Sequence, residues 1–227
     1  MLSREYRQEL IYRLLWLFWS GDFATLDRSI LTSEGNKSVS MRIENLAYFF
    51  FGNNVIIGSH IRKQLEFLKQ IIPPYFQQRE TDDLGCGDGK VTLLLKEIFQ
   101  PSKLRGFDIN PGLVRRARNK GIEAEIRNLE ENLPTGELAV LWGVLHHLHD
   151  KESCLKRVKE NYQLIFIREP IKAGTIRGLE LGHTLRKEEI EHLVQNHLAN
   201  SQIYYCGNNI FIFHVSPRLN AKALAAD

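Results

Sequence analysis

The segment from Asp83 to Gly89, DLGCGDG, most narrows what this chain can fold into. It stands between a short strand-like run and an amphipathic helical pattern, so the chain must turn tightly there. Glycine allows such a turn, and it lets a ligand approach the main chain without meeting a Cβ atom. The N-terminus of the following helix favours anionic groups. The segment therefore predicts a nucleotide-like ligand.

Two common nucleotide-binding motifs do not fit this segment. The dinucleotide fingerprint G-x-G-x-x-G or A, counted from Gly85, ends at Lys90, which is too large for close packing of helix on strand. The P-loop pattern G-x-x-x-x-G-K-[ST] cannot be laid over these residues either. The segment thus argues against both NAD and a P-loop nucleotide.

From about residue 79 onward, short apolar runs alternate with amphipathic helical patterns, which is typical of βαβ units and a parallel sheet. A helix that opens at Thr184 and a hairpin around Gly207-Asn208-Asn209 should follow. The pattern predicts an α/β fold with helices in the gaps between its parallel strands. The strands are expected at residues 80–84, 104–108, 123–127, 138–143, 163–167, 203–206 and 210–215.

Asp108 closes the second predicted strand, roughly 20 residues after the glycine segment. At that place an acidic side chain can accept hydrogen bonds from both hydroxyls of a ribose. Since the carboxyl ends of parallel strands meet at one edge of a sheet, Asp108 and the glycine segment should face the same crevice. The two features together predict a ligand with a ribose and no phosphate.

Three motifs now stand in order: DLGCGDG at 83–89, FDIN at 107–110 and LWGVLHHL at 141–148. With this spacing the chain resembles the class I S-adenosylmethionine-dependent methyltransferases over roughly residues 79 to 215. The resemblance implies a Rossmann-like, seven-stranded, mostly parallel sheet with helices on both faces and an antiparallel last strand. It also implies S-adenosylmethionine as the cofactor and methyl transfer as the reaction.

The resemblance also implies where the cofactor would lie. The glycine segment would surround its methionine moiety, Asp108 would hold the ribose hydroxyls, and Ile109 would lie against the adenine. Two residues after the third strand would reach the adenine, and two at the end of the fourth strand would border the sulfonium. The implied cofactor-binding residues are Asp83, Gly85, Cys86, Gly87, Asp108, Ile109, Asn128, Leu129, Trp142 and Gly143.

Catalysis of methyl transfer needs a general base only when the acceptor is protonated and weakly acidic. His146 and His147 follow the fourth predicted strand and are the candidate catalytic residues. In related families, an Asn or Asp followed by Pro-Pro and an aromatic residue grips an exocyclic or amide nitrogen. This arrangement is absent at 142–145, so the resemblance argues against methylation of adenine or glutamine nitrogens. We therefore expect a small-molecule O or N acceptor. An RNA or tRNA methyltransferase, or a non-catalytic protein that binds S-adenosylmethionine or S-adenosylhomocysteine, stays open as an alternative.

One feature departs from the family pattern. A central parallel strand is normally apolar because both of its faces are buried, yet here residues 79–82 read RETD. An unpaired buried carboxylate would cost several kcal/mol. Either Asp82 finds partners, or this strand is shorter and more solvated than usual.

The remaining sequence bounds the other classes of function. Residues 1–75 are helical and aromatic in pattern and are expected to form a cap over the cofactor end of a methyltransferase domain at 76–217, with a tail at 218–227. A net charge of +3 argues against nucleic acid as the main partner, although the basic run at 115–120 leaves RNA open. Three dispersed cysteines indicate neither disulfides nor a metal site. The apolar run 10–19 is too short to span a membrane, so a cytoplasmic protein is expected, of open oligomeric state.

Overall fold

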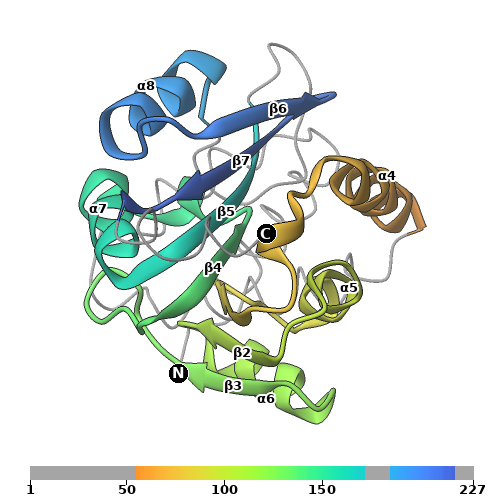
Figure 1. The fold of residues 1–227 in the computed structure, drawn as a ribbon. Coiled ribbons are helices and arrows are strands. Elements are labelled where there is room, and N and C mark those ends of the chain that lie inside the picture. The colour runs from red at the N-terminus through yellow and green to blue at the C-terminus, as the bar shows by residue number, and fades with distance from the viewer. Residues whose placement is uncertain (1–54, 172–184, 218–227) are drawn as a thin grey trace, which may run out of the picture.

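A computed structural model describes residues 55–171 and 185–217 of the chain, with side chains from Ile61 onward. The predicted N-terminal cap therefore lies mostly outside the described residues, as do the predicted tail, Thr184 and the loop before it. The described residues form a seven-stranded sheet in the order β3-β2-β1-β4-β5-β7-β6, drawn in Figure 1. The cap and the domain boundaries stay predictions.

The strands match the positions expected from the sequence within three residues at each end. They are β1 Glu80–Leu84, β2 Lys103–Asp108, β3 Glu123–Ile126, β4 Gly136–Trp142, β5 Tyr162–Pro170, β6 Gln202–Cys206 and β7 Asn209–Val215. The helices of the described residues are α4 Val55–Ile71, α5 Lys90–Phe99, α6 Pro111–Asn119, α7 Lys151–Asn161 and α8 Lys187–His197, with short 3-10 turns η2 Pro74–Phe76 and η3 Leu145–His147.

β1 lies inside the sheet and pairs in parallel with β2 on one side and β4 on the other. β5 continues the parallel set, whereas β7 runs antiparallel to both β5 and β6. This arrangement confirms the predicted fold class, including the antiparallel last strand and the terminal hairpin. The carboxyl ends of β1, β2, β4 and β5 consequently meet at one edge of the sheet, where open α/β sheets bind ligands.

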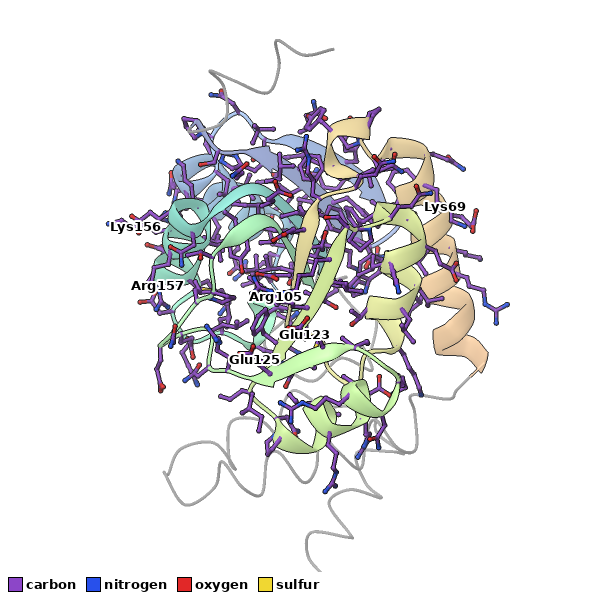
Figure 2. All side chains as sticks on the ribbon, turned by 60° about the horizontal axis from the view of Figure 1, so that its bottom comes forward. Lys69, Arg105, Glu123, Glu125, Lys156 and Arg157 are labelled. Atoms are coloured by element: carbon purple, nitrogen blue, oxygen red, sulfur yellow. The ribbon has the colours of Figure 1, made fainter. Side chains whose placement is uncertain are left out.

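Helices cover the two faces of the sheet separately. On one face, α4 and α5 pack on an aromatic core shared by β4, β5 and β7. On the other face, α7 and α8 pack on the aliphatic side chains of β4 and β5. Figure 2 shows this division, with Lys69 of α4 and Lys156 of α7 on opposite sides of the molecule. The largest buried side chains of the aromatic core are Phe76, Phe99, Phe166, Phe211 and Phe213.

The prediction that a helix fills every gap was wrong between β3 and β4. Residues 128–135 instead form a short turn, in which the carbonyl oxygen of Asn128 accepts hydrogen bonds from the amides of Glu131 and Asn132. Leu129 and Leu133 insert from this turn into the core. Because eight residues must both turn and cross back to β4, a helix with a buried face does not fit. Without it, polar side chains of β2 and β3 gather on this part of the sheet, as Arg105, Glu123 and Glu125 do in Figure 2.

The polar first strand is explained by partners on that face. Asp82 is buried, and Arg105 donates to both of its carboxylate oxygens, from Nε to Oδ1 and from Nη2 to Oδ2, at 2.7 Å each. The hydroxyl of Tyr162 donates to Oδ2 at 2.8 Å. A Cβ atom at Gly136 would lie 3.1 Å from Oδ2 and 3.0 Å from the Tyr162 ring, so this glycine leaves room for the network. Of the two alternatives for Asp82, the first is confirmed.

Candidate active site

The glycine segment forms the loop between β1 and α5. Gly85, Gly87 and Gly89 have positive φ angles of 84°, 55° and 80°, in the left-handed region that side chains disfavour. The amides of Gly85 and Cys86 both donate to the carbonyl oxygen of Phe107, at 2.7 and 3.0 Å. The loop is thus held against the end of β2.

Neighbouring side chains also fix the shape of this loop. A Cβ atom at Gly85 would lie 2.6 Å from Cγ2 of Val144, and one at Gly89 would lie 2.4 Å from Cδ1 of Ile122. The ammonium of Lys120, just beyond α6, donates to the carbonyl oxygen of Asp88 and lies 3.2 Å from its carboxylate. The loop is therefore packed from both sides, and larger residues at these glycines would force the backbone apart.

Asp108 faces the glycine loop from the end of β2. Its Oδ2 atom accepts a hydrogen bond from the amide of Gly87 at 2.9 Å, and its Oδ1 atom accepts one from the amide of Asn110 at 2.8 Å. Burial raises the pKa of this carboxyl group, and the two amide hydrogen bonds oppose that shift. Each carboxylate oxygen has a second lone pair, so the group can still accept two hydroxyl hydrogen bonds.

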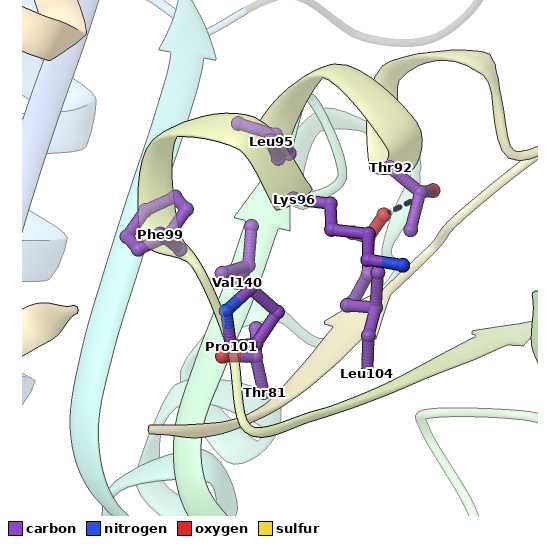
Figure 3. A pocket seen from close by; sticks show the side chains of 9 residues that line it. Thr81, Thr92, Leu95, Lys96, Phe99, Pro101, Leu104 and Val140 are labelled. Carbon is purple, nitrogen blue, oxygen red and sulfur yellow. Dashed lines mark hydrogen bonds between the residues drawn. The ribbon is translucent and has the colours of Figure 1, made fainter. Parts of the chain in front are cut away.

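Asp83 is buried at the end of β1 and is only half satisfied. The hydroxyl of Thr92, in the first turn of α5, donates to its Oδ2 atom at 2.6 Å, whereas Oδ1 has no hydrogen-bond partner. Burial raises the pKa of Asp83 to about 7; the Thr92 hydrogen bond opposes the shift and the charge of Asp108 adds to it. A small, nearly apolar cavity of about 10 Å³ lies beside Asp83 under α5 (Figure 3), bordered by Thr81, Thr92 and Val140 among others. Oδ1 can therefore accept a proton or a cationic donor.

Two exposed isoleucines flank Asp108 at the carboxyl ends of β2 and β3. Ile109 is 45% exposed and Ile126 is 55% exposed, and Ile126 pairs with Asp108 across the strands. Ile109 was expected here, but sequence reasoning missed Ile126, although an apolar residue that ends an edge strand was a usable signal. Together they offer an apolar surface next to the Asp108 carboxylate.

Asn128 and Leu129 differ in where their side chains lie. The Asn128 side-chain oxygen accepts a hydrogen bond from the amide of Glu130 at 3.1 Å, which holds the turn after β3. Leu129 is 6% exposed and its side chain belongs to the core on the α7 face. Asn128 stands at the edge of the sheet, whereas the Leu129 side chain points into the protein.

Cys86 fills space within the protein. Its sulfur lies where a side chain of Gly106 would be, since a Cβ atom there would come within 2.8 Å of Sγ. Burial strongly raises the pKa of its thiol, so the nucleophilic thiolate is disfavoured. Cys86 shapes the loop through its main-chain amide, which donates a hydrogen bond to the carbonyl oxygen of Phe107.

Trp142 and Gly143 end β4. The guanidinium of Arg168, from the neighbouring strand β5, lies 5.4 Å from the centre of the Trp142 ring. Gly143 has a φ of 69°, and its amide donates to the carbonyl oxygen of Arg168 at 2.7 Å. A Cβ atom at Gly143 would lie 3.3 Å from Nη1 of Arg168, so the glycine lets the two strand ends approach closely.

His146 is held by a buried carboxylate that the sequence did not reveal. Glu169 is fully buried; its Oε1 atom accepts hydrogen bonds from the amides of Val144 and Leu145, both at 2.6 Å. Its Oε2 atom lies 2.8 Å from Nδ1 of His146. Because the carboxylate is an acceptor, Nδ1 carries the proton, and Nε2 is the nitrogen that can take up another. A Cβ atom added at Gly143 would lie 3.7 Å from Cε1 of the His146 ring.

The other histidines of this region differ from His146. The centres of the His146 and His147 rings are 4.0 Å apart and the rings are tilted by 40° to each other, but His147 is exposed. The main chain of His149 donates to Glu130 at the start of α7. Of the predicted pair, His146 is therefore the one whose tautomer the structure fixes.

Three features of the described residues bear on the other functions weighed from the sequence. In the basic run after Asn110, Arg118 donates to the carbonyl oxygen of Ala124 and Lys120 is bonded to the glycine loop, so both are engaged within the protein. No helix within 55–171 or 185–217 is long and apolar enough to cross a membrane. The same residues hold no group of three or more His, Cys, Asp or Glu side chains placed to bind a metal ion.

Comparisons with known proteins agree with this geometry. Residues 83–162 match a family model described as "Methyltransferase domain". No match was found among curated proteins. Among solved structures, human N-acetylserotonin methyltransferase in complex with SAM is 17% identical, with a TM-score of 0.57 over 82% of this chain and 57% of that one. Magnesium protoporphyrin IX methyltransferase from Synechocystis PCC 6803 is 13% identical, with a TM-score of 0.57 over 83% of this chain and 99% of that one.

The mitomycin 7-O-methyltransferase MmcR is 15% identical, with a TM-score of 0.53 over 70% of this chain and 55% of that one. This chain thus spans little more than half the length of that enzyme and of the human one. At these identities the likeness shows the fold. Together with the family model, it confirms the resemblance drawn from the three motifs.

Proposed function

We propose that this chain, which carries a class I methyltransferase domain, transfers a methyl group from S-adenosylmethionine to a small-molecule O or N acceptor. The observation that carries the proposal is the Asp108 carboxylate, which faces the glycine loop with a lone pair left on each oxygen. A cytoplasmic location and a small-molecule partner are part of the same proposal.

The residues present fit this cofactor. Asp108 can accept hydrogen bonds from the two ribose hydroxyls, while Ile109 and Ile126 provide apolar contact for a purine beside it. Asp83 keeps a buried oxygen without a partner, which suits the ammonium of an amino acid moiety. The glycine loop next to it opens onto the N-terminus of α5, which favours a carboxylate.

When bound, S-adenosylmethionine would supply an electrophilic methyl group with a good leaving group, so most of the rate enhancement can come from positioning. Trp142 and Gly143 would border the reacting end, because they close β4 next to the glycine loop. His146 would accept the acceptor's proton at Nε2, and the proton on Nδ1 would stay bonded to Glu169. Glu169 is thus a positioning residue that sets the tautomer and orientation of His146.

Calorimetry with S-adenosylmethionine and S-adenosylhomocysteine tests the cofactor. We expect the wild type to bind both, and Asp108→Ala to bind them at least about tenfold more weakly, because it loses the ribose contacts. Glu123→Ala, an exposed carboxylate on β3, is the matched control and should leave both affinities within about twofold. Binding of neither compound to the wild type would exclude the enzyme and the non-catalytic cofactor-binding protein together.

Turnover on a small-molecule acceptor tests the base. His146→Ala should lower kcat about 100-fold for an acceptor that must lose a proton, with little change in cofactor affinity. Glu169→Gln should lower kcat less, since the amide oxygen can still accept from Nδ1 but no longer compensates the charge of a protonated ring. Unchanged turnover of His146→Ala across pH 6 to 9 would remove it from the mechanism. Salt-dependent binding of RNA would instead favour the nucleic acid alternative.

A further inference from the structure

The side chain of Gln64, on helix α4, is buried without any hydrogen-bond partner. It is 2% exposed, and neither its Oε1 nor its Nε2 atom has a hydrogen-bond partner. The amide groups of buried glutamines are normally satisfied, because an unpaired buried polar group costs free energy. Its neighbours on the helix, Leu65 and Leu68, are ordinary core residues. A hydrophobic side chain would serve the core better than this amide.

The position of Gln64 follows from the aromatic contacts of its helix. Phe76, just after α4, packs on Phe213, and Phe67 packs on Phe211 at 5.3 Å between ring centres. Going back along α4 from Phe76 to Phe67, the contacts on β7 therefore move from Phe213 to Phe211. This is the direction of Asn209, which pairs with Pro170 at the carboxyl end of β5. Gln64 lies three residues before Phe67, about 4.5 Å further along the helix axis in that direction.

The carboxyl end of the sheet beneath this part of α4 is polar. Trp142 packs edge-on against Phe211 at 6.2 Å, so Phe211 contacts both Phe67 and the end of β4. The Arg168 guanidinium lies over the Trp142 ring, and it donates to the side-chain oxygen of Asn209. Gln64 thus approaches the edge of the sheet at which β4 and β5 end and β7 begins.

This place is on the acceptor side of the proposed cofactor. Adjacent strands lie about 4.8 Å apart, so in the order β2-β1-β4-β5-β7 the ribose contact at Asp108 is about 14 Å from β5 and about 19 Å from β7. The glycine loop and Asp83, which fit the amino acid moiety, stand at β1. The ends of β5 and β7 therefore lie away from the residues that fit the cofactor, and the proposed function would put the acceptor on this side.

We propose that Gln64 is a specificity-determining residue that binds an amide or lactam group of the methyl acceptor. This inference rests on the proposed function. A primary amide presents its carbonyl oxygen and one of its two N–H donors side by side in a plane, and a group that satisfies both is a C=O next to an N–H. A carboxylate would satisfy only Nε2 and would leave Oε1 unpaired. Small acceptors with a lactam edge, whose N or O atom is then methylated, fit this requirement.

The probe is 2-pyridone, with 1-methyl-2-pyridone as the matched compound that keeps the C=O group but lacks the N–H. Both are titrated into the full chain with S-adenosylhomocysteine present, while the side-chain amide signals of 15N-labelled protein are followed by NMR. Gln64→Met is the test variant. Gln70→Met, an exposed glutamine of the same helix, is the control.

In the wild type and in Gln70→Met, 2-pyridone should shift the amide signals of Gln64 and bind at least about fivefold more tightly than 1-methyl-2-pyridone. Gln64→Met should lose this preference and keep its affinity for S-adenosylhomocysteine within about twofold, and its Tm should not fall, since it no longer buries an unpaired amide.

Three results would overturn the inference. They are no preference between the probes in the wild type, the same preference in Gln64→Met, or a loss of S-adenosylhomocysteine binding in Gln64→Met, which would assign the residue to the cofactor. Failure of the wild type to bind S-adenosylhomocysteine is a separate outcome, and it would overturn the proposed function itself.

Discussion

Asp82 and Asp83 are consecutive residues of the same central strand, and both are buried, yet their surroundings are opposite. Asp82 faces the side of the sheet where Arg105 and Tyr162 occupy both of its oxygens. Asp83 faces α5, where one hydroxyl bonds one oxygen and the other oxygen has no partner. Since side chains alternate across a strand, two adjacent carboxylates can belong to separate environments.

The difference predicts a structural role for Asp82 and a ligand-binding role for Asp83. A carboxylate whose oxygens already accept hydrogen bonds inside the protein is poorly placed to bind a ligand. Removal of its partners should instead lower the free energy of unfolding. A carboxyl group whose pKa is raised to about 7 by burial can lose its proton when a cation binds beside it. The two residues should therefore respond differently to substitution, to ligand and to pH.

The largest effect is expected on the Asp82 side. Arg105→Leu leaves Asp82 buried with Tyr162 alone and should lower the free energy of unfolding by about 3 kcal/mol, measured by urea denaturation. Cofactor affinity should stay within about twofold. Lys103→Leu, which removes an exposed ion pair with Glu123 on the same strands, is the control and should cost less than about 1 kcal/mol. A cost as small as that control's would show that the network contributes little.

On the other side of the strand, Asp83→Asn should act mainly on the ligand. We expect S-adenosylmethionine affinity to fall about 10- to 100-fold, because an amide cannot compensate the charge of the ammonium. Stability at pH 7 should not fall, since the carboxyl group is already penalised by burial. Calorimetry and thermal unfolding measure the two effects. A variant that unfolds while a refolded fraction still binds the cofactor normally would contradict the assignment.

The pH dependence of binding sharpens the comparison further. In the ligand-free protein Asp83, with a pKa raised to about 7, is about half protonated at pH 7, and an ammonium ligand lowers that pKa. Binding should therefore release about half a proton at pH 7 and nearly one at pH 6, seen as a dependence of the binding enthalpy on the buffer. Asp83→Asn should abolish the release. Proton uptake, or a release that persists in the variant, would contradict the role of Asp83.

The raised pKa of Asp83 should also make the ligand-free protein less stable as the pH rises. The folded state binds the Asp83 proton more tightly than the unfolded chain does, so this contribution is complete below pH 3.8 and is lost as the pH rises through about 7. The wild type should accordingly lose more stability between pH 5 and 8 than Asp83→Asn does, whereas the exposed control Lys103→Leu should keep a slope close to that of the wild type. Denaturation at several pH values measures the three slopes.

The smallest expected effect is that of Tyr162→Phe. The variant removes one hydrogen bond to Asp82 and keeps both bonds from Arg105, so it should cost about 1 kcal/mol. Tyr204→Phe, a tyrosine of β6 with a long 3.4 Å contact to Gln202, is the control and should be close to neutral. A cost for Tyr162→Phe equal to that of Arg105→Leu would mean that the hydroxyl, and not the ion pair, keeps Asp82 buried.

The parts of the site that local spacing encodes could be predicted from the sequence. The loop at 83–89 and Asp108 come from a strand-turn-helix pattern that needs no knowledge of distant contacts, and Asn110 caps α6 as a residue before a proline can. The apolar residues of α5 do not by themselves show which face is buried, since Leu94 is 38% exposed whereas Thr92 and Phe99 are buried.

The parts that depend on distant contacts could not be predicted. Arg168-Glu169-Pro170 reads as a polar end to β5, and nothing local indicates that Glu169 reaches the amides of η3 and the His146 ring. The hydroxyl partner of Asp82 stands 80 residues away in the chain. Gln64 looks like an ordinary helix residue, and its burial follows from the packing of α4 on the sheet.

Val144 connects the two halves of the site. Its methyl group occupies the place of a Gly85 side chain, and its amide is held by Glu169, the same carboxylate that holds His146. Such a link acts like a rigid spacer between the loop that would seat the donor and the imidazole that would serve the acceptor. Their separation is then set once, during folding, and need not be re-established by a closing motion at every turnover.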